Sequence, residues 1–130
     1  MPVSPMDFIG EASRALEGGE EISFRAGISR AYYGLYSAAI AYADTLSEVP
    51  ISACSGSTHK KLVDFLAEQM VGGRELVLKH RQLSYKLKAM HAQRVKADYH
   101  LDDEIQREEA ETVLLTCRDM IEKISVLGAV

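Results

Sequence analysis

An arginine and a histidine late in the chain are the side chains best suited to chemistry on a phosphate. Arg94 and His100 lie six positions apart, in a stretch with helical spacing of its apolar residues. The arginine guanidinium is a planar fork of N–H donors that matches phosphate oxygens and stays charged at any working pH. The histidine imidazole has an unperturbed pKa of roughly 6.5, so it exchanges protons near neutrality. Together the two side chains could bind a phosphodiester and move the proton of a nearby hydroxyl.

Helix geometry sets a condition on this pair. Six residues at about 100° each place Arg94 and His100 about 120° apart on a straight α-helix, whereas His91 lies about 60° from Arg94. Arg94 and His100 can share a site only if the helix tightens or ends near Tyr99, or if a second subunit brings its own copy of the pair. Two structural alternatives remain open. Arg94 could form an ion pair with Asp98, and His100 could simply lie at a helix end, where the dipole favours a cation.

Charge is unevenly distributed along the chain, whose formal net charge is −4. The stretch 76–97 carries six basic residues and no acidic one, whereas the stretch 102–122 carries eight acidic residues and two basic ones. The negative total argues against a general nucleic-acid coat protein, but the basic stretch predicts a locally positive patch. The alternative is a solvated helix face packed beside acidic neighbours.

Length and composition predict a single soluble domain over residues 1–130. Apolar residues make up 47% of the chain and charged residues 26%, which is ordinary for a globular protein. The first residues lack the basic and apolar regions of a secretory signal. The uncharged stretch 31–43 is too short and too polar to cross a bilayer. We therefore expect a cytoplasmic protein without a membrane partner.

Cysteine and histidine spacing gives no indication of a metal centre. Cys54 and Cys117 fit a reduced pair better than a disulfide, which agrees with a cytoplasmic location. His80 and His91 are 11 residues apart and return to the same helix face. No cysteine or carboxylate joins them at ligand spacing, so we expect neither a metal site nor a cofactor.

Apolar residues recur at helical spacing almost throughout, and alternating strand patterns are missing. The pairs Gly18-Gly19 and Gly72-Gly73, together with Pro50, interrupt this pattern. We predict an all-α, antiparallel bundle of four or five helices with short connections. The first predicted helix begins at about Ser4 or Pro5 and ends at Leu16. The others cover about 22–46, 59–70, 74 through the apolar stripe that ends at Leu101, and 104–126.

The start of the last predicted helix carries a capping signal. Asp102 or Asp103 resembles an N-cap, and Asp103 followed by Gln106 resembles a capping box. Acidic residues crowd the turn that follows, where the helix dipole favours them. The pattern predicts a break in the chain here and a helix that begins near Glu104.

The remaining histidine and four tyrosines favour structural roles. His59, at the start of a predicted helix, is expected to be a buried hydrogen-bonding residue rather than a catalyst. The tyrosines can stack on bases in principle, but their helical spacing indicates packing in the core or at a dimer contact. They are Tyr32, Tyr33, Tyr36 and Tyr42.

Three segments resemble one known family. The run Ser29-Arg30-Ala31-Tyr32-Tyr33-Gly34-Leu35-Tyr36-Ser37-Ala38-Ala39 is similar to the second helix of HEPN domains, whose name stands for higher eukaryotes and prokaryotes nucleotide-binding. The run His59-Lys60-Lys61-Leu62-Val63-Asp64-Phe65 resembles the next element. The run Arg94-Val95-Lys96-Ala97-Asp98-Tyr99 resembles the R-x-x-A-D-Y segment of a small bacterial branch, in which an acidic helix also follows. The resemblance covers residues 12–124.

The resemblance implies a HEPN-like bundle that pairs as a two-fold dimer and cuts RNA without a metal. Arg94 would hold the phosphate, and His100 would help to deprotonate the ribose 2′-hydroxyl or to protonate the leaving oxygen. The products would carry 2′,3′-cyclic phosphate and 5′-hydroxyl ends. Four neighbouring residues are expected to support catalysis or bind RNA: His91, Lys96, Asp98 and Tyr99.

The family resemblance also implies partners and an alternative. Related proteins are often toxins or defence effectors, and some are encoded beside a nucleotidyltransferase that acts as antitoxin. This chain has Val95 where many catalytic members have a polar residue, and Asp102 where many have tyrosine. The alternative is therefore a non-catalytic module that binds a nucleotide or a nucleotidyltransferase, or a purely structural helical dimer.

Overall fold

The computed structural model describes residues 3–51 and 57–128, and within these ranges the chain is all-helical, without a β-strand. The predicted all-α bundle is thereby confirmed at the level of architecture. Five helices make it up: α1 (Pro5–Leu16), α2 (Glu21–Leu46), α3 (Thr58–Glu68), α4 (Gly73–Tyr99) and α5 (Arg107–Gly128).

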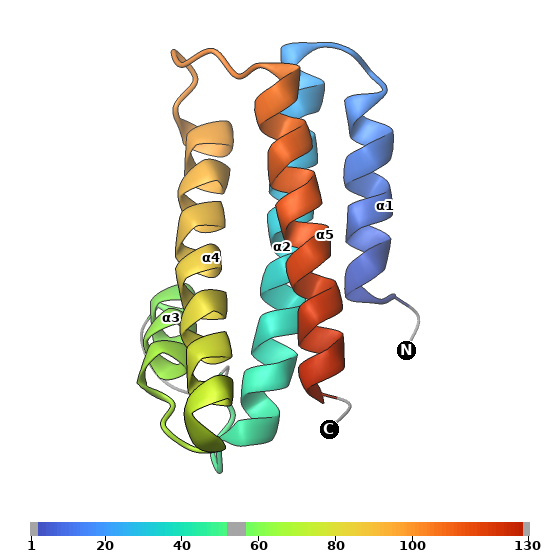
Figure 1. The fold of residues 1–130 in the computed structure, drawn as a ribbon. Helices are drawn as coiled ribbons and strands as arrows, with labels where there is room; N and C mark the ends of the chain where they lie inside the picture. Colours follow the sequence, from blue (N-terminus) through green and yellow to red (C-terminus); the bar gives the residue numbers. More distant parts are fainter. Residues whose placement is uncertain (1–2, 52–56, 129–130) are drawn as a thin grey trace.

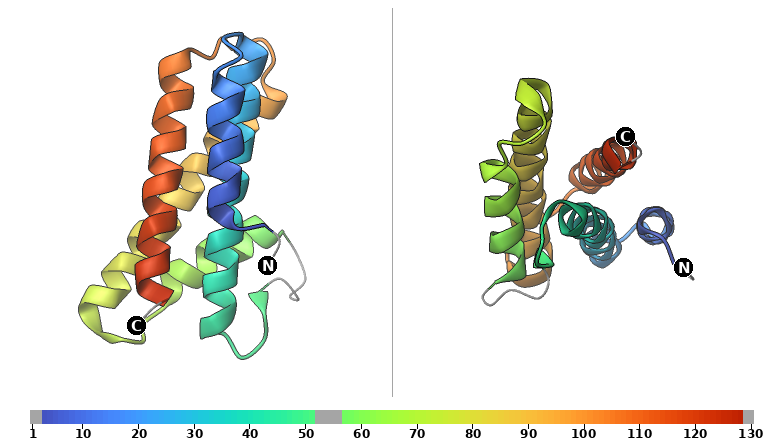
Figure 2. Two further views of the ribbon diagram at one scale, coloured as in Figure 1. Left: turned by 90° about the vertical axis from the view of Figure 1, so that its right-hand side faces the viewer. Right: turned by 90° about the horizontal axis from the view of Figure 1, so that it is seen from below.

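The central element of the bundle is α2, which contacts each of the other four helices. α1 and α4 run in one direction, and α2 and α5 run in the opposite direction (Figure 1). α1, α2 and α5 form one group, while the short α3 lies alongside α4 (Figure 2). The surface where α2, α3 and α4 meet therefore brings together the three segments that carry the family resemblance.

Small residues let α2 approach its neighbours closely. A Cβ atom added at Gly34 would lie 2.8 Å from the Pro5 carbonyl oxygen and 3.1 Å from Phe8 Cβ, both of α1. Alanines occupy other buried positions of α2. The largest fully buried apolar side chains come from four of the helices: Ile28, Leu35, Leu62, Leu66, Leu83, Leu87 and Cys117. This core holds α4 against α2 along the length that carries the candidate site.

The predicted break before the last helix exists, but the predicted capping box does not. α5 begins at Arg107 rather than near Glu104, and the side chain of Glu109 accepts a 3.4 Å hydrogen bond from the Gln106 backbone N–H instead. The reason is tertiary, because Ile105 is buried in the core at 2% exposure and draws the connection inward. The Asp103–Gln106 pattern was therefore a wrong indication.

Three smaller differences concern helix ends. Leu101 continues the apolar stripe in the sequence but lies beyond the end of α4 and is 73% exposed. α3 stops at Glu68, before the predicted end at 70, and is followed by Gly72 and Gly73 with positive φ angles of 99° and 87°. Leu46, at the end of α2, is 40% exposed.

Further predictions concern the two cysteines and membrane-spanning segments. Cys54 and part of the connection between the helices predicted over 22–46 and 59–70 lie outside the described residues. Cys117 is buried, and burial raises the pKa of its thiol to about 12. Among the helices that the structure describes, none combines the length and apolar character needed to cross a bilayer.

Candidate functional site

Arg94, near the end of α4, is held by a carboxylate one turn later. Its Nε lies 2.8 Å from Asp98 Oδ2, and the two side chains are 34% and 28% exposed. The Ser29 hydroxyl on α2 donates a 3.4 Å hydrogen bond to the same oxygen. The ion pair that the sequence offered as an alternative is thus formed. It occupies Nε, and none of the described residues accepts a hydrogen bond from the two terminal nitrogens.

Beside Arg94, one aromatic cluster joins three helices. The Tyr32 hydroxyl on α2 lies 2.7 Å from His59 Nδ1 on α3. The His59 ring stacks on the His91 ring of α4, with centroids 3.6 Å apart and planes 17° from parallel. Tyr32 also meets His91 edge to face, with centroids 5.6 Å apart. His59 therefore makes the hydrogen bond expected of it, and its stacking fixes the His91 ring as well.

The protonation states of this cluster follow from its burial. Burial and then the neighbouring His91 lower the pKa of His59 to about 4. Burial and then Arg94 lower the pKa of His91, and burial raises the pKa of Tyr32. At neutral pH both imidazoles are thus uncharged and the phenol keeps its proton. The tautomer of the His59 ring decides which partner donates in the hydrogen bond between the Tyr32 hydroxyl and His59 Nδ1.

These side chains surround an open hollow of about 260 Å³. Ligand pockets usually enclose about 300–1,000 Å³, so the hollow lies just below the usual size range. Two cationic side chains and two neutral imidazoles meet there with hydroxyl and aromatic groups. The lining residues are Ser29, Arg30, Tyr32, Tyr33, Tyr36, His59, His91 and Arg94.

His100 lies apart from the hollow. α4 ends at Tyr99, which is one of the alternatives under which Arg94 and His100 could share a site, and His100 follows with φ −93° and ψ 72°. Its side chain is 58% exposed, and Nδ1 lies 3.7 Å from Asp103 Oδ2. His100 is not among the residues that line the hollow. A single copy of the chain brings Arg94 together with His91 and His59, but not with His100.

A residue that the sequence analysis did not consider determines where His100 lies. Arg25 on α2 is 6% exposed and donates hydrogen bonds to the carbonyl oxygens of Ala97 at 3.0 Å and His100 at 3.2 Å. Glu21 balances its charge at 2.8 Å. A signal was present in the sequence, because Arg25 precedes Ile28 by three residues on the core-facing side of its helix.

The remaining predicted site residues, Lys96 and Tyr99, differ in what they contact. Lys96 pairs with Glu109 of α5 at 3.1 Å, so it ties two helices together. Tyr99 is 65% exposed, and its ring lies 5.5 Å from the guanidinium carbon of Arg94. Lys79, farther back on the basic stretch, pairs with Glu75 at 3.3 Å. Part of the predicted positive patch is thus neutralised by carboxylates.

The tyrosines divide between core and surface. Tyr32 and Tyr42 are buried at 7% exposure each, which agrees with packing, whereas Tyr33 is 48% exposed. Tyr42 also makes a 2.7 Å hydrogen bond to His80 Nε2. Tyr32, Tyr33 and Tyr36 line the hollow, and Tyr33 is the most exposed of the three.

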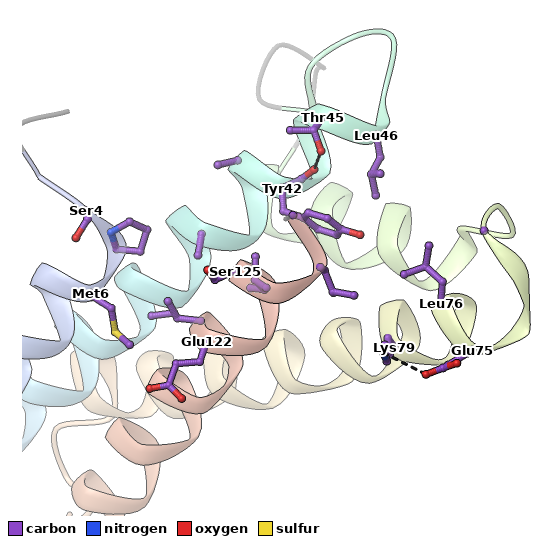
Figure 3. Close-up of a pocket in the computed structure, with 18 residues that line it drawn as sticks. Ser4, Met6, Tyr42, Thr45, Leu46, Glu75, Leu76, Lys79, Glu122 and Ser125 are labelled. Carbon is purple, nitrogen blue, oxygen red and sulfur yellow. Dashed lines mark hydrogen bonds and ion pairs between the residues drawn. The ribbon is translucent and has the colours of Figure 1, made fainter. Parts of the chain in front are cut away.

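A larger groove lies at the other end of the bundle, where the starts of α1 and α4 meet the ends of α2 and α5 (Figure 3). It encloses about 1180 Å³, and its charged lining residues include Glu122 and the Lys79–Glu75 pair. None of the predicted site residues lines it. We therefore place the candidate site in the smaller hollow, where the basic and titratable side chains gather.

Comparison of the chain with protein-family models, curated proteins and solved structures finds no match.

Proposed function

We propose that the protein is a metal-independent endoribonuclease with a HEPN-like fold, which acts as a homodimer through Arg94 and His100. The observation that supports it most is the surroundings of Arg94. Its guanidinium is partly exposed, borders an open hollow that uncharged imidazoles also line, and has terminal nitrogens without a partner among the described residues. Such a fork binds two phosphate oxygens at once and stabilises charge that develops on them.

The reaction is an internal transesterification of RNA. The ribose 2′-oxygen attacks the adjacent phosphorus, and the bond to the 5′-oxygen of the next nucleotide breaks. Arg94 holds the phosphate, while His100 exchanges a proton with one of the two reacting oxygens. The products carry 2′,3′-cyclic phosphate and 5′-hydroxyl ends. Because His100 lies outside the hollow of its own chain, a second copy completes the site.

The biological setting proposed for this activity is a toxin or defence effector. A toxin of this kind would be held in check by a neutralising partner, and a nucleotidyltransferase of the antitoxin type is the class that the family resemblance suggests. Single-stranded RNA is the substrate class, since an in-line attack needs a ribose that can leave helical geometry.

A second candidate is a non-catalytic module that binds a nucleotide or such a partner. The observation in its favour is that Arg94 already pairs with Asp98 and Lys96 with Glu109. In this alternative the ion pairs serve the fold, and His100 is a surface residue beside Asp103.

A cleavage assay separates the two candidates. Purified protein is incubated with total RNA and with a short single-stranded RNA in EDTA, beside Arg94→Ala and His100→Ala variants whose folding is checked by circular dichroism. Cyclic-phosphate ends from the wild type alone support the endoribonuclease. Cleavage that persists in both variants excludes the proposed site, and absence of cleavage by folded wild type favours the binding module.

A further inference from the structure

We propose that His91 is the general base of the reaction, and that it acts on the same phosphate as His100 from a second copy of the chain. This inference rests on the proposed endoribonuclease function and assigns the base, which that function left open. It is carried by the hollow, which brings His91 together with Arg94 while His100 lies elsewhere.

His91 is placed to reach a phosphate that Arg94 holds. The two residues are three apart on α4, so their Cα atoms are separated by about 4.5 Å along the helix axis and about 60° around it. Both side chains line the hollow. None of the described residues bonds to the His91 ring nitrogens, so they can meet a ribose hydroxyl that enters with the phosphate.

The His91 ring is held in one orientation by residues from two other helices. His59 stacks on it with a centroid separation of 3.6 Å, and Tyr32 contacts it edge to face at 5.6 Å. The Tyr32 hydroxyl in turn fixes His59 through the 2.7 Å hydrogen bond to Nδ1. Tyr32 and His59 are therefore positioning residues, and the substrate meets His91.

The groups that face His91 favour its uncharged form. The guanidinium of Arg94 lies on the same helix and that of Arg30 on α2, and both line the hollow. His59 comes from α3, and the phenols of Tyr32, Tyr33 and Tyr36 come from α2. None of the eight lining residues is a carboxylate, and burial together with Arg94 lowers the pKa of His91. An uncharged imidazole at neutral pH is the form that a general base requires.

The geometry assigns the second proton transfer, to the leaving 5′-oxygen, to His100 of another copy of the chain. Nine residues separate His91 from His100, which amounts to about 13.5 Å along a helix and about half a turn around it. One phosphate cannot touch both rings of the same chain. In a two-fold dimer, the end of α4 in one copy can face the end of α4 in the other copy, with the two helices running in opposite directions.

The proton balance of the step is then complete. His91 takes the proton of the 2′-hydroxyl as the new bond from the 2′-oxygen to phosphorus forms. The bond from phosphorus to the 5′-oxygen breaks, and the protonated imidazole of His100 gives its proton to that oxygen. Arg94 binds the two oxygens of the phosphate that do not react.

The first test is the single-turnover cleavage rate of a short RNA with His91→Ala, beside Gln82→Ala as a control at an uncharged, exposed position of α4. We expect His91→Ala to lower the rate by about 100- to 10,000-fold, with RNA affinity and thermal midpoint close to those of the control. Free imidazole should restore part of the rate, because a small base can enter the space left by the ring. A loss that imidazole does not restore would overturn the base assignment and leave His91 a structural role.

The second test is complementation between two inactive variants. His91→Ala and His100→Ala proteins are mixed, dissociated in mild denaturant and allowed to reassociate. Random pairing of equal amounts should restore about a quarter of the wild-type sites, because each mixed dimer holds one intact site. No recovery, with mixed dimers shown by two different tags, would overturn the sharing of one phosphate between copies.

The outcomes distinguish the inference from the function on which it rests. Full activity of His91→Ala with loss of activity in His100→Ala would overturn the inference and leave the endoribonuclease in place. Absence of cleavage by the folded wild type would overturn both.

Discussion

The guanidinium of Arg25 on α2 donates a 3.0 Å hydrogen bond to the carbonyl oxygen of Ala97, 72 residues later in the chain. The same group also binds the carbonyl oxygens of His100 and Asp103. The last carbonyls of a helix lack partners within it, and a cation there is favoured by the dipole. By binding these carbonyl oxygens, Arg25 fixes the residue at which α4 ends and the position of the backbone at His100.

Replacing Arg25 should destabilise the protein strongly. We expect Arg25→Leu to lower the free energy of unfolding by about 2–3 kcal/mol, because several buried carbonyl oxygens lose a charged donor. Urea unfolding followed by circular dichroism measures the change. Arg14→Ala is the control, since Arg14 is 65% exposed and pairs with Glu11 on its own helix, and such a pair contributes about 0–1 kcal/mol. Equal losses in the two variants would contradict the role given to Arg25.

Features confined to one helix could be predicted from the sequence. Spacing alone gave the ion pair of Arg94 with Asp98, since four residues return a side chain to the same face. It also indicated that Arg94 and His100 of one chain could share a site only if the helix tightened or ended near Tyr99. The start of α1 at Pro5 and the end of α2 at Leu46 follow equally local signals.

Features that depend on two or more helices could not be predicted from the sequence. The stack of His59 on His91 joins residues 32 positions apart, and no periodic pattern relates the rings of separate helices. The carbonyl contacts of Arg25 with the end of α4 are of the same kind. The start of α5 was misplaced because Asp103 and Gln106 carry a good local capping signal that the burial of Ile105 overrides.

The contact of α1 with α2 should be sensitive to one methyl group. We expect Gly34→Ala to destabilise the protein by about 1–3 kcal/mol, because the new Cβ would lie 2.8 Å from the Pro5 carbonyl oxygen. Gly10→Ala is the matched control in a helix, since its nearest neighbour is the flexible end of Arg14 at 3.9 Å. There we expect a gain of up to about 1 kcal/mol from helix propensity. If the thermal midpoints of both variants rose, the close contact of Gly34 with Pro5 would be disproved.

Stability should fall as the pH is lowered from neutrality. The pKa of His59 is about 4 in the folded protein and roughly 6.5 in the unfolded chain, so the unfolded chain binds more protons between these values. The stability due to uncharged His59 is present above about pH 6.5 and is lost as the pH falls towards 4. The lowered pKa values of His80 and His91 act in the same direction.

Urea unfolding at a series of pH values between about 7.5 and 4.5 measures this dependence. His59→Asn should reduce the slope of unfolding free energy against pH, because one of the contributing imidazoles is removed. His100→Asn is the control, since that ring is 58% exposed. A slope that changes equally in both variants would show that burial of His59 is not its cause.

Removing the carboxylate that holds Arg94 should strengthen RNA binding. We expect Asp98→Asn to tighten the binding of a 2′-O-methyl RNA, which cannot be cleaved, by about 1.5- to 5-fold, in line with the ~0.2–1 kcal/mol of a partly exposed pair.

Asp64→Asn is the matched control, because Lys60 and Asp64 form the same i,i+4 pair at 2.8 Å on α3. Both variants remove one negative charge, so a long-range effect of net charge would raise the two affinities equally. Fluorescence anisotropy at low and high salt measures both affinities. A gain specific to Asp98→Asn would identify Arg94 as an RNA-binding group that its partner partly occupies, and equal affinities of Asp98→Asn and wild type would assign the pair to the fold alone.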